Sequence, residues 1–311
     1  MSSHHHPVPQ ARFRELIRAV YSGRYKNSRE DVARFGASIE DWDVSQVTDM
    51  SEAFRGCKFF RADLSRWDTS NVTTMANMFR EVRAFNAPIG RWDTGRVTTM
   101  KGMFRDTWIF NQPIGGWNTS RVTNMSNMFR EARAFNAPVE GWDVGRVRDM
   151  HDMFRRAASF HQPLEGWDVS AVEDMRCMFR EAWAFHQPLE GWDVSHVRNM
   201  SGMFYDAYAF NQPLERWDVA RVTNFAVMFY GAFHFDQGLE GWDTVRATTV
   251  RGMFAQASRL RPPPPPRDWT WTLPSTRYVD EMDIYNTSYR AYLPRRRRRW
   301  DRLLSVRVRG L

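Results

Sequence analysis

Apolar residues recur along this chain with a period of 25 residues. The tryptophans keep this register without a slip, at Trp42, Trp67, Trp92, Trp117, Trp142, Trp167, Trp192, Trp217 and Trp242. A fixed period of this length predicts stacked units, none of which can bury its apolar face alone. We therefore expect residues 42–266 to form one continuous array of nine units.

The spacing of apolar residues changes within a unit. From Val72 to Phe79 they follow at intervals of three, three and one, which suits one face of a short helix. Around the tryptophan the spacing shortens, since Ile89 precedes Trp92 by three residues and Thr94 follows it by two, and this favours a short strand. Pro88 marks a turn. Each unit is expected to contain a short strand, a turn and about two turns of helix.

The segment before the array predicts a helical cap. Residues 9–22 place apolar side chains on one helical face. Ser28 to Asp31 resembles a capping box, and it would open a second short helix that ends at Gly36. Because a stack of repeats needs a cover over its first unit, we assign residues 1–41 to an N-terminal cap.

Two segments show the repeat most clearly, and they resemble units of BspA-type leucine-rich-repeat surface proteins. They are FNQPIGGWNTSRVTNMSNMF (110–129) and FHQPLEGWDVSHVRNMSGMF (185–204). The resemblance covers every unit, and it implies an α/β fold: a leucine-rich-repeat-like solenoid of nine strand-plus-helix units. It also implies surface display, adhesion or protein binding rather than catalysis.

The net charge of +8 is concentrated in the last segment of the chain. Residues 42–266 carry 26 basic and 26 acidic side chains, whereas residues 267–311 carry eleven arginines and five acids. After five prolines at 262–266, this aromatic and Arg-rich tail contains the run Arg295, Arg296, Arg297, Arg298 and Arg299. Such a run suits nucleic acid, an anionic membrane or an acidic protein surface, and a solvated or internally docked tail is the alternative.

Few features indicate a cellular location or a cofactor. The N-terminus has no apolar run of signal-peptide length, and no stretch approaches a transmembrane span. We expect an intracellular protein or part of an assembly, although the resembling family is often surface-exposed. Cys57 and Cys177 lie in units one and six, at different positions of the unit, so neither a disulfide nor a metal site is expected. No cofactor is expected either.

Aspartate follows eight of the nine tryptophans, with Asn118 in the remaining unit. One interpretation is structural: each side chain accepts backbone N–H groups two or three residues on, in an Asx-turn. The other is an exposed acidic strip that binds a cationic partner, for which the candidates are Asp143, Asp168, Asp193 and Asp218.

The position 16 residues after each tryptophan varies and includes Trp108, Trp183, Tyr208 and Phe233. The last three occupy successive units, as a protein-binding hot spot would. Packing against a flank is the alternative.

Two further columns are expected to be structural. Arg55 to Arg180 recur every 25 residues beside acids, which favours a salt-bridged ridge over an anion site. The column that contains His161 and His186 otherwise holds mostly asparagine, which favours a ladder of turns over metal binding.

These patterns predict a non-enzymatic repeat scaffold for protein–protein interaction. No catalytic set stands apart from the repeat, because the candidate acids recur in nearly every unit. The alternative is a structural component of a large assembly, anchored by its basic tail to an acidic protein surface or nucleic acid.

Overall fold

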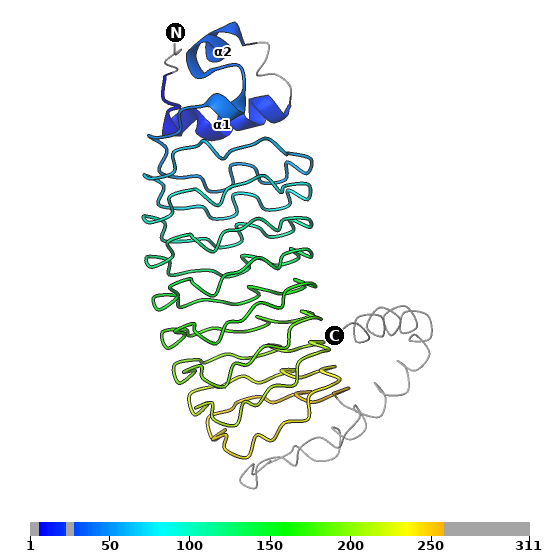
Figure 1. The fold of residues 1–311 in the computed structure, drawn as a ribbon. Coiled ribbons are helices and arrows are strands. Elements are labelled where there is room, and N and C mark those ends of the chain that lie inside the picture. Colours follow the sequence, from blue (N-terminus) through cyan, green and yellow to red (C-terminus); the bar gives the residue numbers. More distant parts are fainter. Residues whose placement is uncertain (1–5, 23–27, 258–311) are drawn as a thin grey trace, which may run out of the picture. The chain divides into compact units, whose positions relative to one another are not determined.

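The computed structural model describes residues 6–22 and 28–257 (Figure 1). Among these residues, three short helical elements stand at the N-terminal end: α1 (Gln10–Tyr21), α2 (Arg29–Phe35) and the 3-10 helix η2 (Ile39–Asp41). In this described part, no helix is long and apolar enough to cross a bilayer. The proline run and the Arg-rich tail, with Arg295–Arg299, lie outside the described residues.

The two predicted N-terminal helices are present, and α1 contacts the first units of the array. Its buried face consists of Phe13, Leu16 and Ile17, and the ring of Phe13 lies 5.7 Å from that of Trp67. The Gln10 Oε1 atom accepts the N–H groups of Thr48 and Asp49, each at 2.9 Å. Helix α1 therefore closes the end of the stack both with apolar contacts and with hydrogen bonds.

Helix α2 begins at a side-chain cap and is linked to α1 by an ion pair. The Ser28 hydroxyl accepts the N–H of Asp31, as the sequence predicted. The Asp31 carboxylate in turn lies 2.8 Å from the Arg12 guanidinium. These contacts join the two helices across a sequence separation of 19 residues.

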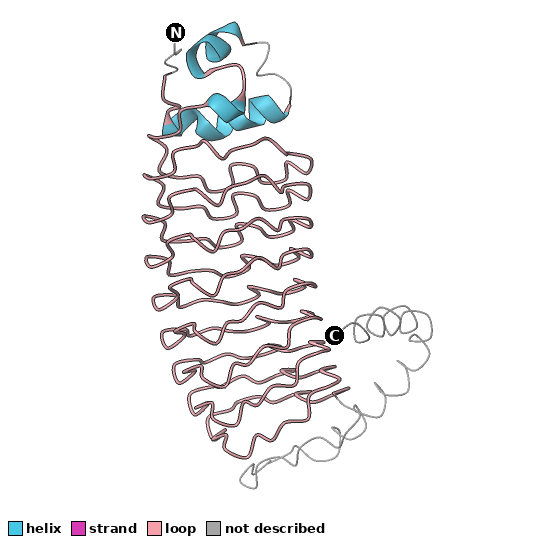
Figure 2. Cartoon of the chain, viewed as in Figure 1, coloured by secondary structure: helices cyan, strands magenta, loops and turns pink. Residues whose placement is uncertain are grey.

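The rest of the described chain is a stack of 25-residue coils built from turns (Figure 2). The predicted strand-plus-helix unit is wrong, and with it the α/β leucine-rich-repeat fold class, because residues 42–257 contain neither a helix nor a strand. Neighbouring coils share isolated parallel bridges instead, one residue to a coil. The bridges run through Asp49, Thr74, Thr99, Asn124, Asp149, Asp174, Asn199, Asn224 and Thr249.

Two left-handed residues in each coil exclude the helix. We number positions from each tryptophan, so that Trp+10 in the first coil is Glu52. Positions +10 and +14 have φ between 49° and 76° in every coil. They are Glu52, Asn77, Gly102, Asn127, Asp152, Cys177, Gly202, Val227 and Gly252, and then Gly56, Glu81, Asp106, Glu131, Arg156, Glu181, Asp206, Gly231 and Gln256. A right-handed helix cannot continue through such residues.

The hydrogen bonds explain why this backbone is favourable. The N–H groups of Met75, Asn77 and Phe79 donate to carbonyls of the next coil, at 3.2, 2.7 and 2.9 Å. Between them, the N–H of Met78 returns to the Met75 carbonyl at 3.1 Å. Because N–H groups alternate between the next coil and their own, buried backbone groups find partners without a continuous strand.

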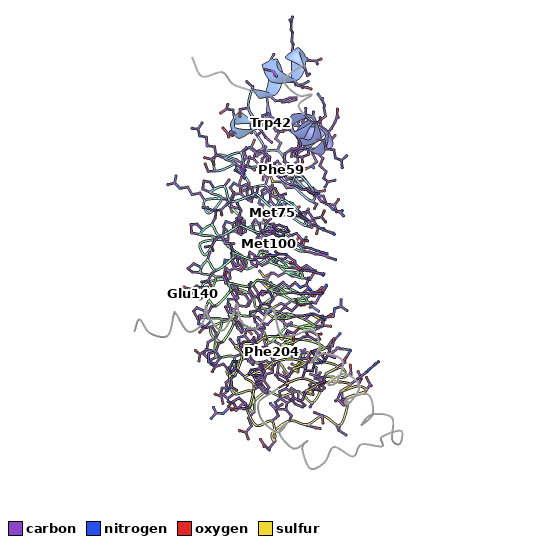
Figure 3. All side chains as sticks on the ribbon, turned by 90° about the vertical axis from the view of Figure 1, so that its right-hand side faces the viewer. Trp42, Phe59, Met75, Met100, Glu140 and Phe204 are labelled. Carbon is purple, nitrogen blue, oxygen red and sulfur yellow. The ribbon has the colours of Figure 1, made fainter. Side chains whose placement is uncertain are left out.

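The interior consists of columns of identical or similar side chains, as Figure 3 shows for Met75 and Met100. Adjacent tryptophan rings stack nearly parallel, for example Trp92 and Trp117 at 6.5 Å and 2°. From Trp67 to Trp242, each indole Nε1 donates to the carbonyl 28 residues earlier, at 2.8 to 3.1 Å. The tryptophan register is thus a register of packing and of hydrogen bonds between coils.

Candidate partner-binding surface

The four candidate aspartates after tryptophan each cap a turn and are exposed at the same time. Asp143, Asp168, Asp193 and Asp218 are all exposed, and the Oδ1 atom of each accepts the N–H two residues on at 3.0 to 3.1 Å. The predicted Asx-turn is therefore confirmed. Hydrogen bonds from the Ser170 side chain and backbone lower the pKa of Asp168, so this carboxylate is charged at neutral pH. These four aspartates present negative charge on successive coils.

The aromatic column at +16 separates into two environments. Trp108 lies between two guanidinium groups, with the Cζ atoms of Arg83 and Arg133 at 4.2 and 4.5 Å from its ring. This cation–π stack covers both of its faces. Trp183, by contrast, is 43% exposed. The candidate Trp108 is thus held by its own column and is not grouped with the other three.

The coils that follow Trp183 extend its aromatic surface. Tyr208 and Phe233 stack at 5.3 Å with 4° between their planes, and His234 meets the Tyr208 ring edge-on at 4.9 Å. Both rings are half-buried. We call Trp183, Tyr208 and Phe233, on coils six to eight, the aromatic surface.

The sequence interpretation missed a second aromatic pair on these coils. Tyr205 and Tyr230 stack at 4.6 Å, and the Arg180 Cζ lies 3.9 Å from the Tyr205 ring. The missed signal is the replacement of arginine by tyrosine at +13 in successive coils, because stacked aromatic residues tolerate one another where stacked cations repel.

The arginine column forms the predicted ridge of ion pairs. Arg80 and Arg105 pair with the acid that follows each of them, at 3.1 and 3.5 Å. One coil interrupts the acids, because Arg156 stands at +14 and contacts Glu131 and Glu181, both at 2.7 Å. Arg55, Arg130 and Arg155 pair instead with acids at +10, at 2.8 to 3.5 Å. Acids at +14 and +10 therefore compensate the column of positive charge, and it is no open anion site.

The histidines of the turn column replace asparagine as hydrogen-bonding groups. Asn136 Oδ1 accepts the N–H of His161 at 2.8 Å, and His186 Nδ1 accepts the N–H of Asn211 at 3.3 Å. The ladder of turns is confirmed.

A family model described as "Mycoplasma protein of unknown function, DUF285" matches residues 24–121, 107–207 and 162–269. The chain belongs to this family. Three overlapping matches agree with a repeat protein and fit the resemblance to BspA-type repeats only loosely, since they do not establish that motif.

Other comparisons add little to the family assignment. No curated protein matches the chain. Nineteen chains of solved structures do, among them one titled "Crystal structure of TLR13-ssRNA13 complex". It is 6% identical with a TM-score of 0.21, and the match covers 68% of this chain and 44% of that one. Such a slight likeness informs neither fold nor function.

The cysteines of this DUF285-family chain are two free thiols. Cys57 is buried, which raises its pKa to about 11, and burial also raises the pKa of the half-buried Cys177. Both are therefore protonated and weakly nucleophilic at neutral pH. The described residues contain one His/Asp group whose atoms lie close enough to hold a metal ion: Asp149, His151 and Asp174. Sequence spacing missed it, because its members come from two coils.

Proposed function

We propose that this chain is a non-enzymatic repeat scaffold that binds a protein partner through the aromatic surface. One observation carries the proposal: Trp183 is 43% exposed, one coil before the stacked pair Tyr208 and Phe233. Exposed, rigid aromatic side chains supply binding energy with little loss of side-chain entropy. The three side chains stand at the same position of successive coils.

The rest of the repeat supports a scaffold without catalysis. The acids after each tryptophan close turns, and the acids at +14 pair with arginines. Residues that make these contacts in several coils hold the stack together, and no substrate is needed to explain them. A turnover that depends on one unrepeated side chain would contradict this part of the proposal.

The exposed aspartates supply a second contact in this proposal. Asp143, Asp168, Asp193 and Asp218 lie on successive coils, and each uses Oδ1 in its turn. A carboxylate has two oxygens with several acceptor sites, so it can keep its turn and still accept a hydrogen bond from a lysine or arginine of the partner. We therefore propose a partner with apolar anchors and basic side chains.

The test compares quantitative capture of partners from source cells by matched variants of the full chain. Trp183→Ala combined with Phe233→Ala should abolish capture, because both anchors are removed. Arg133→Ala, at the same position on another coil, is the control and should leave capture unchanged. Circular dichroism and the thermal midpoint establish that all variants fold.

The same experiment distinguishes the alternative of a tail-anchored assembly component. Neutralising Arg295 to Arg299 should leave capture by the scaffold intact. If this change abolishes capture while the double aromatic variant retains it, the scaffold proposal is wrong and the tail is the anchor.

A further inference from the structure

Two carboxylates and an imidazole meet between coils five and six. Asp149 and His151 belong to coil five, and Asp174 occupies the position of Asp149 on coil six. One ligand atom from each of the three lies within 4.8 Å of the others. The side chains are partly buried, with exposed fractions of 29%, 15% and 27% for Asp149, His151 and Asp174.

The pairing of these aspartates is peculiar to this point of the stack. Position +7 bridges each coil to the next, so its residues are direct neighbours. Asp49, the third aspartate at this position of the described coils, adjoins Thr74. Asp149 and Asp174 are therefore the one pair of neighbouring aspartates in this column. Two adjacent carboxylates repel unless a positive charge compensates them.

Apart from the His151 imidazole beside Asp149, the protein compensates this charge only weakly. Asn124 Nδ2 donates to Asp149 Oδ2 at 3.1 Å, and the Arg176 guanidinium, 47% exposed, lies 3.5 Å from Asp174 Oδ2. Because the Arg176 side chain is long and half-exposed, its guanidinium can move away from Asp174 without breaking a buried contact. The Oδ1 atoms of Asp149 and Asp174 accept the backbone N–H groups of His151 and Arg176, at 3.1 and 3.0 Å. A carboxylate has about four acceptor sites, so each can keep these hydrogen bonds and still bind a cation.

His151 is held in a defined orientation. Its Nδ1 atom lies 2.6 Å from Asp149 Oδ1, and its Nε2 atom lies 2.9 Å from Nδ2 of Asn127, which is 7% exposed. Position +9 otherwise holds serine, alanine, lysine or arginine. An imidazole fixed from behind by a buried amide has the arrangement that orients a histidine toward a metal.

We propose that Asp149, His151 and Asp174 bind one divalent transition-metal ion, with Zn²⁺ the best fit to this nitrogen and oxygen set. His151 Nδ1 and one oxygen from each aspartate would be the protein ligands, and water completes a four-coordinate shell. For Nδ1 to bind the metal, the proton of a neutral imidazole would move from Nδ1 to Nε2 by exchange with solvent. The imidazole would then release no net proton. Rotation of the Asn127 amide then presents Oδ1 to Nε2–H.

This site is independent of the aromatic surface and of the proposed scaffold function. Its ligands come from two coils, so bound metal would tie coil five to coil six. A ligand that binds only the folded chain raises its stability. Hard ions such as Mg²⁺ and Ca²⁺ prefer oxygen and gain little from the imidazole.

The repeat itself supplies conservative variants for the test. His151→Ser introduces the residue that stands at this position as Ser126 and Ser201, and Asp174→Asn introduces the counterpart of Asn199. His161→Asn is the matched control, because it removes a histidine from the turn ladder and follows Asn136. All three are expected to fold, which circular dichroism checks.

Zn²⁺ is titrated calorimetrically into the full chain in a background in which His4, His5 and His6 are replaced by serine, so that this run of histidines does not contribute. We expect one site. His151→Ser should abolish it, and Asp174→Asn should weaken it by more than about tenfold, the lower range for loss of an outer-shell partner. His161→Asn should bind Zn²⁺ as the parent chain does. Mg²⁺ added in excess should not change Zn²⁺ binding.

A second readout uses Co²⁺, whose visible absorption reports nitrogen and oxygen coordination. The band should appear with the parent chain and be absent with His151→Ser. The proposal is overturned if Zn²⁺ binds equally to the parent and to His151→Ser, or if the parent binds no Zn²⁺. Neither result would affect the capture experiment on the aromatic surface.

Discussion

At the scale of residues, the surroundings shift the pKa of some aspartates down and of others up, which gives two classes. Asp168 and Asp193 accept hydrogen bonds from the serine two residues on, which lowers the pKa of each. Asp206 has the opposite shift, since burial, with the nearby Glu181 second, raises its pKa to about 6. The first class contributes to a turn in its charged form, whereas ionisation of the second class destabilises the folded chain.

Replacement of Asp206 tests this difference. Because its folded pKa exceeds the unfolded value of 3.8, the free energy of unfolding falls as pH rises from about 4 to about 6 and stays lower above that. Asp206→Asn removes this cost, and asparagine tolerates the positive φ of 49°. We expect stabilisation by about 1–2 kcal/mol at pH 7 and almost none at pH 4, measured by urea denaturation.

The control is Asp93→Asn, which introduces the residue that Asn118 provides at the same position of the next coil. It should change stability little at either pH. If Asp206→Asn is less stable than the parent at pH 7, its carboxylate is not destabilising.

At the scale of elements, the coil is a unit of turns in which two residues adopt φ above zero. Apolar spacing from Val72 to Phe79 suited a helix, but Asn77 interrupts it. Glycine carried the missed signal, because Gly102, Gly202 and Gly252 all stand at +10. Glycine and asparagine tolerate this conformation where β-branched residues do not.

Val227 is the least suitable residue at these positions. It is β-branched at φ 51°, where left-handed backbone costs about 1–2 kcal/mol for most residues. Val227→Asn introduces the residue that Asn77 and Asn127 place at +10, and it should raise the thermal midpoint and stabilise the chain by about 1 kcal/mol. Val227→Ala keeps the Cβ atom and removes the branch, so it should gain less. A midpoint lower for asparagine than for alanine would contradict the backbone explanation.

At the scale of the whole molecule, each coil contacts its neighbours through the same columns. Trp117 stacks on Trp92 and Trp142 at 6.5 and 6.4 Å, and its indole donates to the Ile89 carbonyl. Stability is then a sum of coil and interface contributions, as in other repeat proteins. The register between coils matters more than their number.

Deletion of a whole coil should therefore be tolerated. Removing residues 92–116 joins Arg91 to Trp117 and keeps all columns aligned. We expect a folded protein with cooperative unfolding and a urea m-value reduced roughly in proportion to its lost buried surface. Removing residues 92–113 leaves three residues out of register, and this control should lose cooperative unfolding. Equal behaviour of both deletions would refute a stack held by register.

The sequence by itself determined the period, the buried columns and the two N-terminal helices, and it offered the Asx-turns after each tryptophan as one of two interpretations. These features depend on spacing within about one coil, where side-chain type and local hydrogen bonding decide the outcome. Trp67 and Trp92 are interior for that reason. The coil of turns that replaces the predicted strand-plus-helix unit was beyond such reasoning, because left-handed Glu52 or Glu81 becomes favourable only when the next coil accepts their N–H groups.

Tertiary structure alone decided which side chains of the candidate sites meet. It placed Trp108 between two arginines and left Trp183 exposed, although both stand at +16. It also brought Asp174 beside Asp149 and His151. Residues 25 apart in sequence become neighbours through stacking, so each contact depends on which side chains occupy adjacent coils, and the repeat motif carries no information about that choice.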